Sequence, residues 1–294
     1  MPVRYDITHT TEYRYRQPVR FGEHRVMFRP RDSHDLRVLA TDLEVTPESA
    51  VRMIQDPHSN SVALVQPLTA ANMLKIVCSF TIEHAHSNNL ELPLAPGAQL
   101  FPFAYSVDER FDLEHYLRPA HDDPEGRLTA WARQFIRTDG PTGTHELLVG
   151  MNRHIRERFA YVARDEEGTQ EPNRTLELGS GSCRDFALLM LEAGRRLGIA
   201  TRFVSGYLYD PALDGGPGGG TRGAGQTHAW LQAYLPGAGW VAFDPTNNLL
   251  DDAQLIRVGV ARHPSQAAPI SGSWYGQSGD YLGMSVEVVV QRHP

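Results

Sequence analysis

A cysteine, a histidine and an aspartate occur in an order and a setting that suit acyl-transfer chemistry. Cys183 opens a predicted helix, His228 opens a later predicted strand, and Asp244 ends the strand that follows. In such a set the thiolate attacks a carbonyl carbon, the imidazole moves the proton, and the carboxylate holds the imidazole in one tautomer. The sequence therefore indicates a thiol enzyme, provided that the fold brings the three side chains together.

The helix that carries Cys183 is predicted over residues 183–197. Ser182 and Asp185 have the spacing of a capping box, with Ser182 as the N-cap residue and Asp185 at the third helical position. Cys183 then lies in the first turn, where free backbone N–H groups stabilise a thiolate and can hold an oxyanion. The alternative is a small residue at a helix start with no chemical role. The predicted buried stripe and the glycine that ends the helix are Phe186, Leu189, Met190, Ala193, Leu197 and Gly198.

His228 and Asp244 are predicted to lie on the two strands of an antiparallel hairpin. Polar and apolar residues alternate over 226–235 and over 239–244, and Pro236-Gly-Ala-Gly239 supplies the turn. A four-residue loop would send the two side chains to opposite faces, whereas a three- or five-residue loop, or a bulge, puts them on one face. A lone histidine at a strand start is more often a polar rim residue. The cysteine upstream and the aspartate downstream favour a catalytic interpretation.

The composition excludes several other classes of protein. The chain has 294 residues, a net charge of −7 and no basic block, so nucleic-acid binding is not expected as its main role. It has no run of roughly 18 apolar residues and no signal-like N-terminus, so we expect a soluble, cytoplasmic protein without a membrane partner. Two cysteines are too few for a disulfide framework. Cys78, in the alternating segment 73–82, is expected to be an inert core thiol.

The chain divides into a β-rich part and an α+β part. Short strands and turns over residues 1–85 predict a small antiparallel β-sandwich. A proline-rich stretch from residue 92 to residue 119 is interpreted as a linker, and helical periodicity begins near Leu128. We therefore predict a β-sandwich domain with its linker over residues 1–115 and a catalytic domain over residues 116–294.

Other residues that could carry chemistry are weaker candidates. His84 and His86 could ligate a metal ion from one strand face, but no third ligand is evident nearby. The glycine tract 215–220 lacks the ending of a phosphate loop, so it is interpreted as a flexible loop that could also serve as a lid. Trp230 and Tyr207 could line the site, although a core role is favoured for each. No metal or organic cofactor is predicted.

Four segments, in this order, resemble the transglutaminase-like superfamily, in particular a bacterial branch of proteins named as cysteine proteases. They are Gly181-Ser-Cys-Arg-Asp-Phe-Ala187, Leu197-Gly-Ile-Ala-Thr-Arg-Phe-Val-Ser-Gly-Tyr207, His228-Ala-Trp230 and Gly239-Trp-Val-Ala-Phe-Asp-Pro-Thr-Asn-Asn248. The N-terminal Tyr5-Asp-Ile-Thr-His-Thr-Thr11 is similar to the start of that branch's β-rich region. The resemblance implies a papain-like α+β catalytic domain after an N-terminal antiparallel β-sandwich. It also implies a Cys-His-Asp triad that acts on an amide carbonyl through a thioester.

The predicted function is that of a peptidase or amidase acting on a peptide or protein substrate. Cys183 is the predicted nucleophile, His228 the general base and then acid, and Asp244 the residue that orients His228. Protein cross-linking, in which an amine outcompetes water at the thioester, is the alternative among enzymes, and a non-catalytic binding scaffold is the alternative outside them. The chain departs from the family pattern in substrate-facing segments, at 178–182, at Gln232 and at Ala261-Arg-His263.

Overall fold

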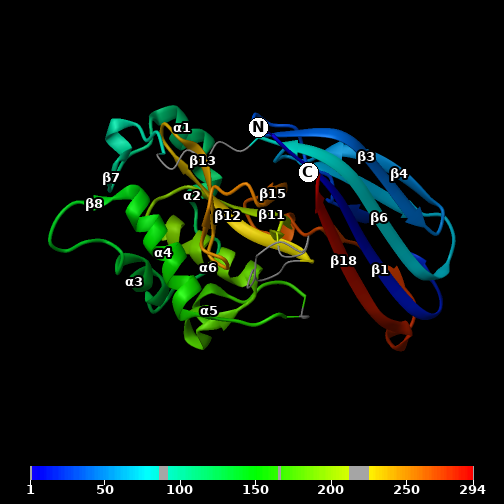
Figure 1. The fold of residues 1–294 in the computed structure, drawn as a ribbon. Helices are drawn as coiled ribbons and strands as arrows, with labels where there is room; N and C mark the ends of the chain where they lie inside the picture. The colour runs from blue at the N-terminus through cyan, green and yellow to red at the C-terminus, as the bar shows by residue number, and fades with distance from the viewer. Residues whose placement is uncertain (1, 86–91, 165–166, 212–224, 294) are drawn as a thin grey trace.

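The structure, a computed structural model, describes residues 2–85, 92–164, 167–211 and 225–293. Strands gather in one half of the molecule and helices in the other, and the two chain ends lie near each other between the halves (Figure 1). Antiparallel sheets and helices are both present, so the predicted α+β class is confirmed. His86 and the glycine tract 215–220 lie outside the described residues.

Two antiparallel sheets form the predicted N-terminal β-sandwich. In the first sheet β1 lies between β6 and β18, and β3 pairs with the other edge of β6. The strands of this sheet are β1 (Val3–Phe21), β3 (Leu36–Thr46), β6 (Ala71–His84), β17 (Trp274–Tyr275) and β18 (Tyr281–Arg292). The second sheet has the order β16 (Ile270–Ser271), β2 (His24–Val26), β5 (Ser61–Pro67) and β4 (Ser49–Gln55).

Burial alternates along β6, as the sequence pattern predicted. Every second side chain from Leu74 to Ile82 is buried against the opposite sheet. Cys78 belongs to this set, and burial raises the pKa of its thiol to about 12. The thiol is therefore protonated at neutral pH, in agreement with the prediction of an inert core cysteine.

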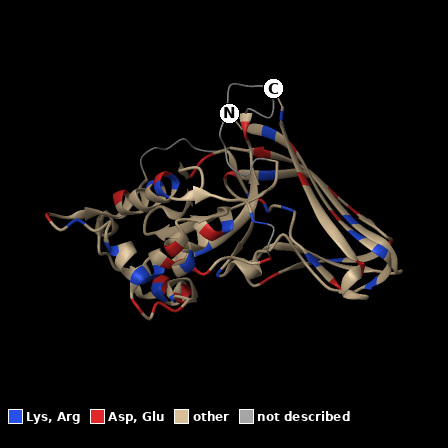
Figure 2. Ribbon diagram, turned by 90° about the horizontal axis from the view of Figure 1, so that it is seen from below, with Lys and Arg blue, Asp and Glu red and all other residues tan. Residues whose placement is uncertain are grey.

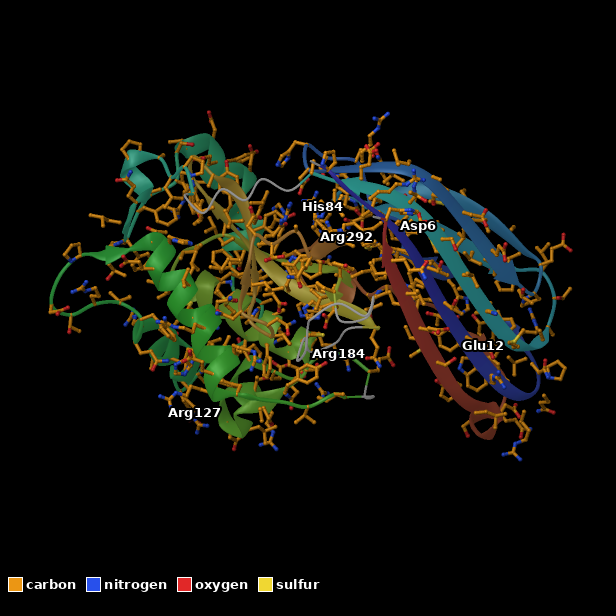
Figure 3. All side chains as sticks on the ribbon, viewed as in Figure 1. Asp6, Glu12, His84, Arg127, Arg184 and Arg292 are labelled. Atoms are coloured by element: carbon orange, nitrogen blue, oxygen red, sulfur yellow. The ribbon has the colours of Figure 1, made fainter. Side chains whose placement is uncertain are left out.

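The end of the chain returns to the N-terminal half. β18 pairs with β1 from Arg292 opposite Tyr5 to Tyr281 opposite Tyr15, and β16 pairs with β2. Figure 1 shows β18 beside β1, and Figure 3 labels Asp6 and Arg292 on these neighbouring strands. The predicted domain boundary between residues 115 and 116 stays a prediction. Within the predicted catalytic domain, however, the strands β16, β17 and β18 pair with strands of the N-terminal sheets. Hydrophobic alternation identifies a strand but not its pairing partner, so the pattern does not predict this return.

A third antiparallel sheet and, among the described residues, six α-helices make up the other half. The sheet has the order β14 (Leu249–Leu250), β13 (Gly239–Asp244), β12 (Thr227–Leu235), β11 (Thr201–Leu208) and β15 (Leu255–Ala261). The helices are α1 (Val107–Asp112), α2 (Glu114–Leu117), α3 (Arg127–Arg133), α4 (Thr144–Arg158), α5 (Pro172–Leu178) and α6 (Cys183–Arg196). Two short ladders pair β7 (Leu100–Phe101) with β8 (Thr142–Gly143), and β9 (Ala160–Tyr161) with β10 (Ser180–Gly181). α6 is the central helix, because Phe186 to Ala193 are all fully buried against the sheet and other helices.

The stretch from residue 92 to residue 119, predicted to be a linker, packs on this half. It carries β7, α1 and α2, and Leu92, Leu94 and Phe101 pack against the core around α6. The hydroxyl of Tyr105 donates a hydrogen bond of 2.9 Å to the carbonyl of Tyr234 on β12. Its prolines suggested an extended connection, but its apolar side chains bind it to the helical half.

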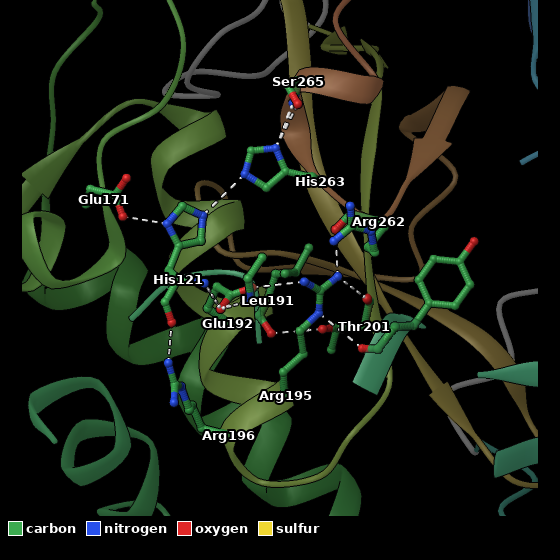
Figure 4. Close-up of polar contacts among 12 residues, drawn as sticks. His121, Glu171, Leu191, Glu192, Arg195, Arg196, Thr201, Arg262, His263 and Ser265 are labelled. Carbon is green, nitrogen blue, oxygen red and sulfur yellow. Dashed lines mark hydrogen bonds and ion pairs between the residues drawn. The ribbon is translucent and has the colours of Figure 1, made fainter. Parts of the chain in front are cut away.

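A buried ion pair joins α6 to its surroundings (Figure 4). Nη1 of Arg195 lies 2.9 Å from Oε1 of Glu192, and both side chains are fully buried. Glu192 also accepts hydrogen bonds from the backbone N–H groups of Ala120 and His121. Arg195 donates to three backbone carbonyls, those of Tyr116, Thr201 and Arg262. These bonds compensate the cost of burying two charges. Because Thr201 begins β11 and Arg262 follows β15, they also hold α6 against these two strands.

Acidic and basic residues are interspersed over both halves in Figure 2, without a continuous basic stripe on the ribbon drawn in colour. In the part of the chain that the structure describes, no helix is long and apolar enough to cross a membrane.

Candidate active site

α6 begins at Cys183, as predicted, and the start of the helix is fixed by Asp185. The backbone of Ser182 is extended (φ −90°, ψ 176°). Oδ2 of Asp185 accepts hydrogen bonds of 2.8 Å from both the backbone N–H and the hydroxyl of Ser182. Cys183 therefore occupies the first helical turn with its thiol partly exposed. Arg184, the next residue, is labelled in Figure 3.

Asp185 also binds a segment that the sequence analysis did not connect with it. Nη1 of Arg164 lies 2.8 Å from Oδ1 of Asp185, and the backbone N–H of Gln170 donates to the same oxygen at 2.7 Å. The Asp185 side chain is fully buried. The segment before α5 is thus held against the turn that carries Cys183. Spacing gave no signal for these contacts, because they join residues 15 and 21 positions apart through irregular backbone.

The hairpin of β12 and β13 has a three-residue loop, and this length decides the orientation of its side chains. Leu235 pairs with Gly239 and Leu231 pairs with Phe243. Gly237 (φ 91°) lies in the left-handed region, which favours glycine. Asp244 follows one residue after the Leu231–Phe243 pair, so its side chain points to the same face as that of His228.

His228 and Asp244 are in direct contact. Nε2 of His228 lies 2.9 Å from Oδ2 of Asp244, and both side chains are fully buried. Oδ1 of Asp244 accepts from the backbone N–H of Thr246 at 2.9 Å, and Oδ2 accepts from the amide of Asn247 at 3.0 Å. Burial alone would raise the pKa of Asp244, but the attraction of His228 and these hydrogen bonds outweigh burial and lower it. Asp244 is therefore an ionised carboxylate at neutral pH.

His228 neighbours Cys183 as well as Asp244. Burial alone would lower the pKa of His228, but the charge of Asp244, its hydrogen bond and then the neighbouring Cys183 raise it above the usual value. Nδ1 of His228 has no well-directed hydrogen bond to any described residue. Because Nε2 is engaged with Asp244, Nδ1 is the nitrogen that remains for the thiol of Cys183. The three residues singled out in the sequence are thus neighbours in space.

Trp230 and Tyr207 differ in their relation to this site. The indole of Trp230 stacks near the His228 ring, with centroids 5.9 Å apart and planes inclined by 27°. Trp230 is buried, so it packs behind the imidazole. Tyr207 is also buried but belongs to the core of the β-sandwich half. The core role favoured for both residues agrees with their burial, and only Trp230 contacts a residue of the candidate site.

The N-terminal motif that contains His9 joins the two halves of the molecule. Nδ1 of His9 lies 2.9 Å from the hydroxyl of Tyr207 on β11, and Nε2 lies 3.0 Å from the hydroxyl of Thr11. The His9 ring stacks on Phe28 with a centroid distance of 3.7 Å. β11 also pairs with β12, with Gly206 opposite His228. The sandwich thus supports the sheet that carries the candidate site.

His84, which was considered above as a metal ligand, is engaged in a hydrogen bond. Nδ1 of His84 lies 3.0 Å from the carbonyl oxygen of Ala253. Within the described ranges, no group of three or more His, Cys, Asp or Glu residues could hold a metal ion.

Two family models match the chain. One, described as the bacterial transglutaminase-like N-terminal region, matches residues 5–83, and the other, described as the transglutaminase-like superfamily, matches residues 129–245. Together they cover more than half of the 294 residues. The chain belongs to the transglutaminase-like superfamily. The second match spans Cys183, His228 and Asp244, and the first contains His9.

Relatives of similar length support this membership. An uncharacterized protein of Mycobacterium leprae is 28% identical over 286 residues, with 97% of this chain and 98% of the relative covered. One of Mycobacterium tuberculosis is 28% identical over 295 residues, covering 97% and 92%. A crystal structure of a “putative cysteine protease” from Cytophaga hutchinsonii has a TM-score of 0.70 at 20% identity, covering 99% of this chain and 91% of that one. This structural likeness shows that the whole fold, sandwich and papain-like part together, is shared.

Proposed function

We propose that the protein is a thiol-dependent acyl-transfer enzyme, a peptidase or amidase that hydrolyses an amide bond through a thioester. The observation that supports this proposal is the position of His228, which is bound to a buried carboxylate through Nε2 and neighbours Cys183. An imidazole held in this way can take the thiol proton and keep it as an imidazolium. Cys183 is the nucleophile and Asp244 orients His228.

The reaction proceeds in two halves. In the first, His228 takes the proton of Cys183, the sulfur attacks the amide carbonyl carbon, and the imidazolium returns the proton to the leaving amine. The product of this half is a thioester on Cys183 and a free amine. In the second, His228 takes a proton from water, the hydroxide attacks the thioester, and the thiol regains its proton as the carboxylic acid leaves.

The start of α6 supplies the electrostatic component. The first turn has backbone N–H groups without an intrahelical partner, and Cys183 itself contributes one of them. A tetrahedral intermediate bound to the Cys183 sulfur places its oxyanion close to these donors, which stabilise it. No metal or organic cofactor is required for any step, and the acyl donor is a peptide or protein.

An activated ester tests the thiol chemistry without knowledge of the natural substrate. We expect p-nitrophenyl acetate to release about one equivalent of p-nitrophenol per protein in a burst, with the acetyl group on the peptide that contains Cys183. Cys183→Ala abolishes the burst, and His228→Ala slows it about 100-fold or more. Cys78→Ala is the matched control, because Cys78 is the other cysteine of the chain and should leave the burst unchanged.

An undiminished burst in Cys183→Ala would contradict the proposal, and so would acetylation at Cys78. The same acyl-enzyme separates hydrolysis from cross-linking. We expect water to resolve it faster than a dansylated alkylamine at millimolar concentration, and preferential incorporation of the amine would indicate a transamidase. The cytoplasmic location stays a prediction, which cell fractionation tests.

A further inference from the structure

The β-sandwich is open along one side, between the edge strands β3 and β4. Strand pairing identifies their inward-facing residues, because directly opposed residues of an antiparallel pair share a face. Leu43 on β3 lies opposite buried Cys78, and Met53 on β4 lies opposite buried Ala63. Met53 faces inward, yet it is 48% exposed, and Val51 beside it is 45% exposed. The two sheets therefore do not close over their core at this edge, which lies in the half away from the helices (Figure 1).

A cavity of about 200 Å³ lies behind this opening, and we call it the sandwich cavity. It is larger than the roughly 150 Å³ cavity that takes up benzene in other proteins and smaller than the pockets of about 300 Å³ or more that hold drug-sized ligands. A ligand for this space is thus a small molecule with an apolar body. Most of its wall is apolar and is formed by Val26, Phe28, Leu43, Met53, Ala63 and Cys78.

One cation, Arg29, lines the sandwich cavity from the segment after β2. No hydrogen bond or ion pair joins Arg29 to another residue in the described ranges, and its Nε atom is buried without a partner, although the residue as a whole is partly exposed. Burial raises the pKa of Cys78, the charge of Arg29 lowers it and the charge of Asp42 raises it, so both charges act on this thiol in the cavity wall. Asp42 also contributes to the cavity lining, but its pairing with Ser79 and its alternation with Leu43 assign it to the outer face of β3.

A buried donor without an acceptor is costly, and a guanidinium fork matches a carboxylate in geometry and charge. We propose that the sandwich cavity binds a small amphipathic carboxylate, whose apolar chain enters between the sheets and whose carboxylate pairs with Arg29. The ligand class is a free medium-chain carboxylic acid. The proposal does not rest on the thiol chemistry, since the cavity contains none of the three residues of the candidate active site.

Calorimetric titration of the full chain with octanoate tests this site. We expect one saturable site for octanoate and at least about tenfold weaker binding of octylammonium, which has the same chain with the opposite charge, and of acetate, which lacks the chain. Arg29→Gln should weaken octanoate binding about tenfold. Arg52→Gln is the matched control, because Arg52 lies on β4 but alternates with the inward-facing Val51 and Met53.

Cys78 reports the location of the ligand. In a Cys183→Ala background it is the remaining cysteine of the chain. Because its thiol is buried and protonated, its reaction with N-ethylmaleimide is slow and requires transient opening of the cavity, and octanoate should make it slower still. Ala63→Met, which fills the cavity from the second sheet, should remove both the binding and the protection while circular dichroism stays native.

Three binding results would overturn the proposal. They are the absence of saturable octanoate binding up to the millimolar range, equal binding of octanoate and octylammonium, and octanoate binding that survives both Arg29→Gln and Ala63→Met. A concentration-dependent dimer in light scattering that Met53→Lys abolishes would assign the open edge to a second copy of the chain, and the carboxylate site would then also be rejected.

Discussion

Nε2 of His228 lies 2.9 Å from Oδ2 of Asp244 at the open end of the β12–β13 hairpin, opposite its turn, and neither side chain is exposed. A second buried histidine shows what this contact does. Among the residues that the structure describes, His9 contacts hydroxyl groups but no carboxylate, and burial lowers its pKa to about 3. For His228 the attraction of Asp244 and Cys183 exceeds the effect of burial and raises the pKa. The carboxylate thus decides whether a buried imidazole is charged or neutral.

Replacing Asp244 by Asn should convert His228 into a neutral histidine like His9. Without the carboxylate, burial dominates and the pKa of His228 falls below 6.5. Long-range ¹H–¹⁵N correlation spectra measure this directly: we expect the His228 ring to be protonated at pH 7.5 in the wild type and neutral in Asp244→Asn. His9 is the internal control and should stay neutral in both proteins. A His228 ring that is neutral at pH 7.5 in the wild type would contradict the assigned role of Asp244.

The same raised pKa predicts a pH dependence of stability. A histidine whose pKa is higher in the folded state than the unfolded value near 6.5 contributes stability fully below that pH, and the contribution is lost as pH rises through the folded-state pKa. Urea unfolding should therefore show a decline in the free energy of unfolding from pH 6.5 upward. In His228→Gln this decline should be smaller. An identical slope in both proteins would rule out His228 as its source.

Asn247 should help to determine the pH below which the rate of the thiol reaction falls. Its amide donates to Oδ2 of Asp244, and this bond helps to lower the pKa of that carboxyl. Asn247→Ala therefore raises the pKa of Asp244 and shifts the acid limb of the pH–rate profile for p-nitrophenyl acetate to higher pH. Thr246→Val is the matched control, because Thr246 binds Asp244 through its backbone N–H, and its hydroxyl has no partner among the described residues. Equal acid limbs in Asn247→Ala and the wild type would exclude this role.

The local features of the site could be predicted from the sequence, whereas its distant supports could not. The start of α6 at Cys183 follows from Ser182 and Asp185, three residues apart, and the hairpin follows from alternation around the Pro236–Gly239 turn. The orientation of Asp244 depended on a loop length that propensity does not define to within one residue. The ion pair of Arg164 with Asp185 and the pairing of β18 with β1 join segments that are distant in the sequence. Hydrophobic periodicity does not predict which distant segments pack together.

Gly206 should be intolerant of any side chain. A Cβ atom at this position of β11 would lie 2.2 Å from the carbonyl oxygen of Ile256 and 2.8 Å from the Trp230 ring. Gly206 also pairs with His228 across the ladder, so a displaced β11 moves the imidazole. Gly206→Ala should cost about 3 kcal/mol in the free energy of unfolding, measured with urea, and slow the acetylation of Cys183. Gly140→Ala, with no atom within 4 Å of its Cβ, should change neither.

Asp185 should be required for the placement of Cys183 as well as for stability. Its buried carboxylate binds Ser182 at the helix start and Arg164 in the preceding segment. Asp185→Ala leaves Arg164 without this partner and should cost about 3 kcal/mol in the free energy of unfolding. It should also slow the alkylation of Cys183 by iodoacetamide. Glu192→Ala separates the two effects, because it breaks the buried pair about two turns after Asp185 along α6. It should cost similar stability without changing the alkylation rate at temperatures where the protein stays folded. Equal alkylation rates in Asp185→Ala and Glu192→Ala would mean that Asp185 stabilises the fold without positioning the thiol.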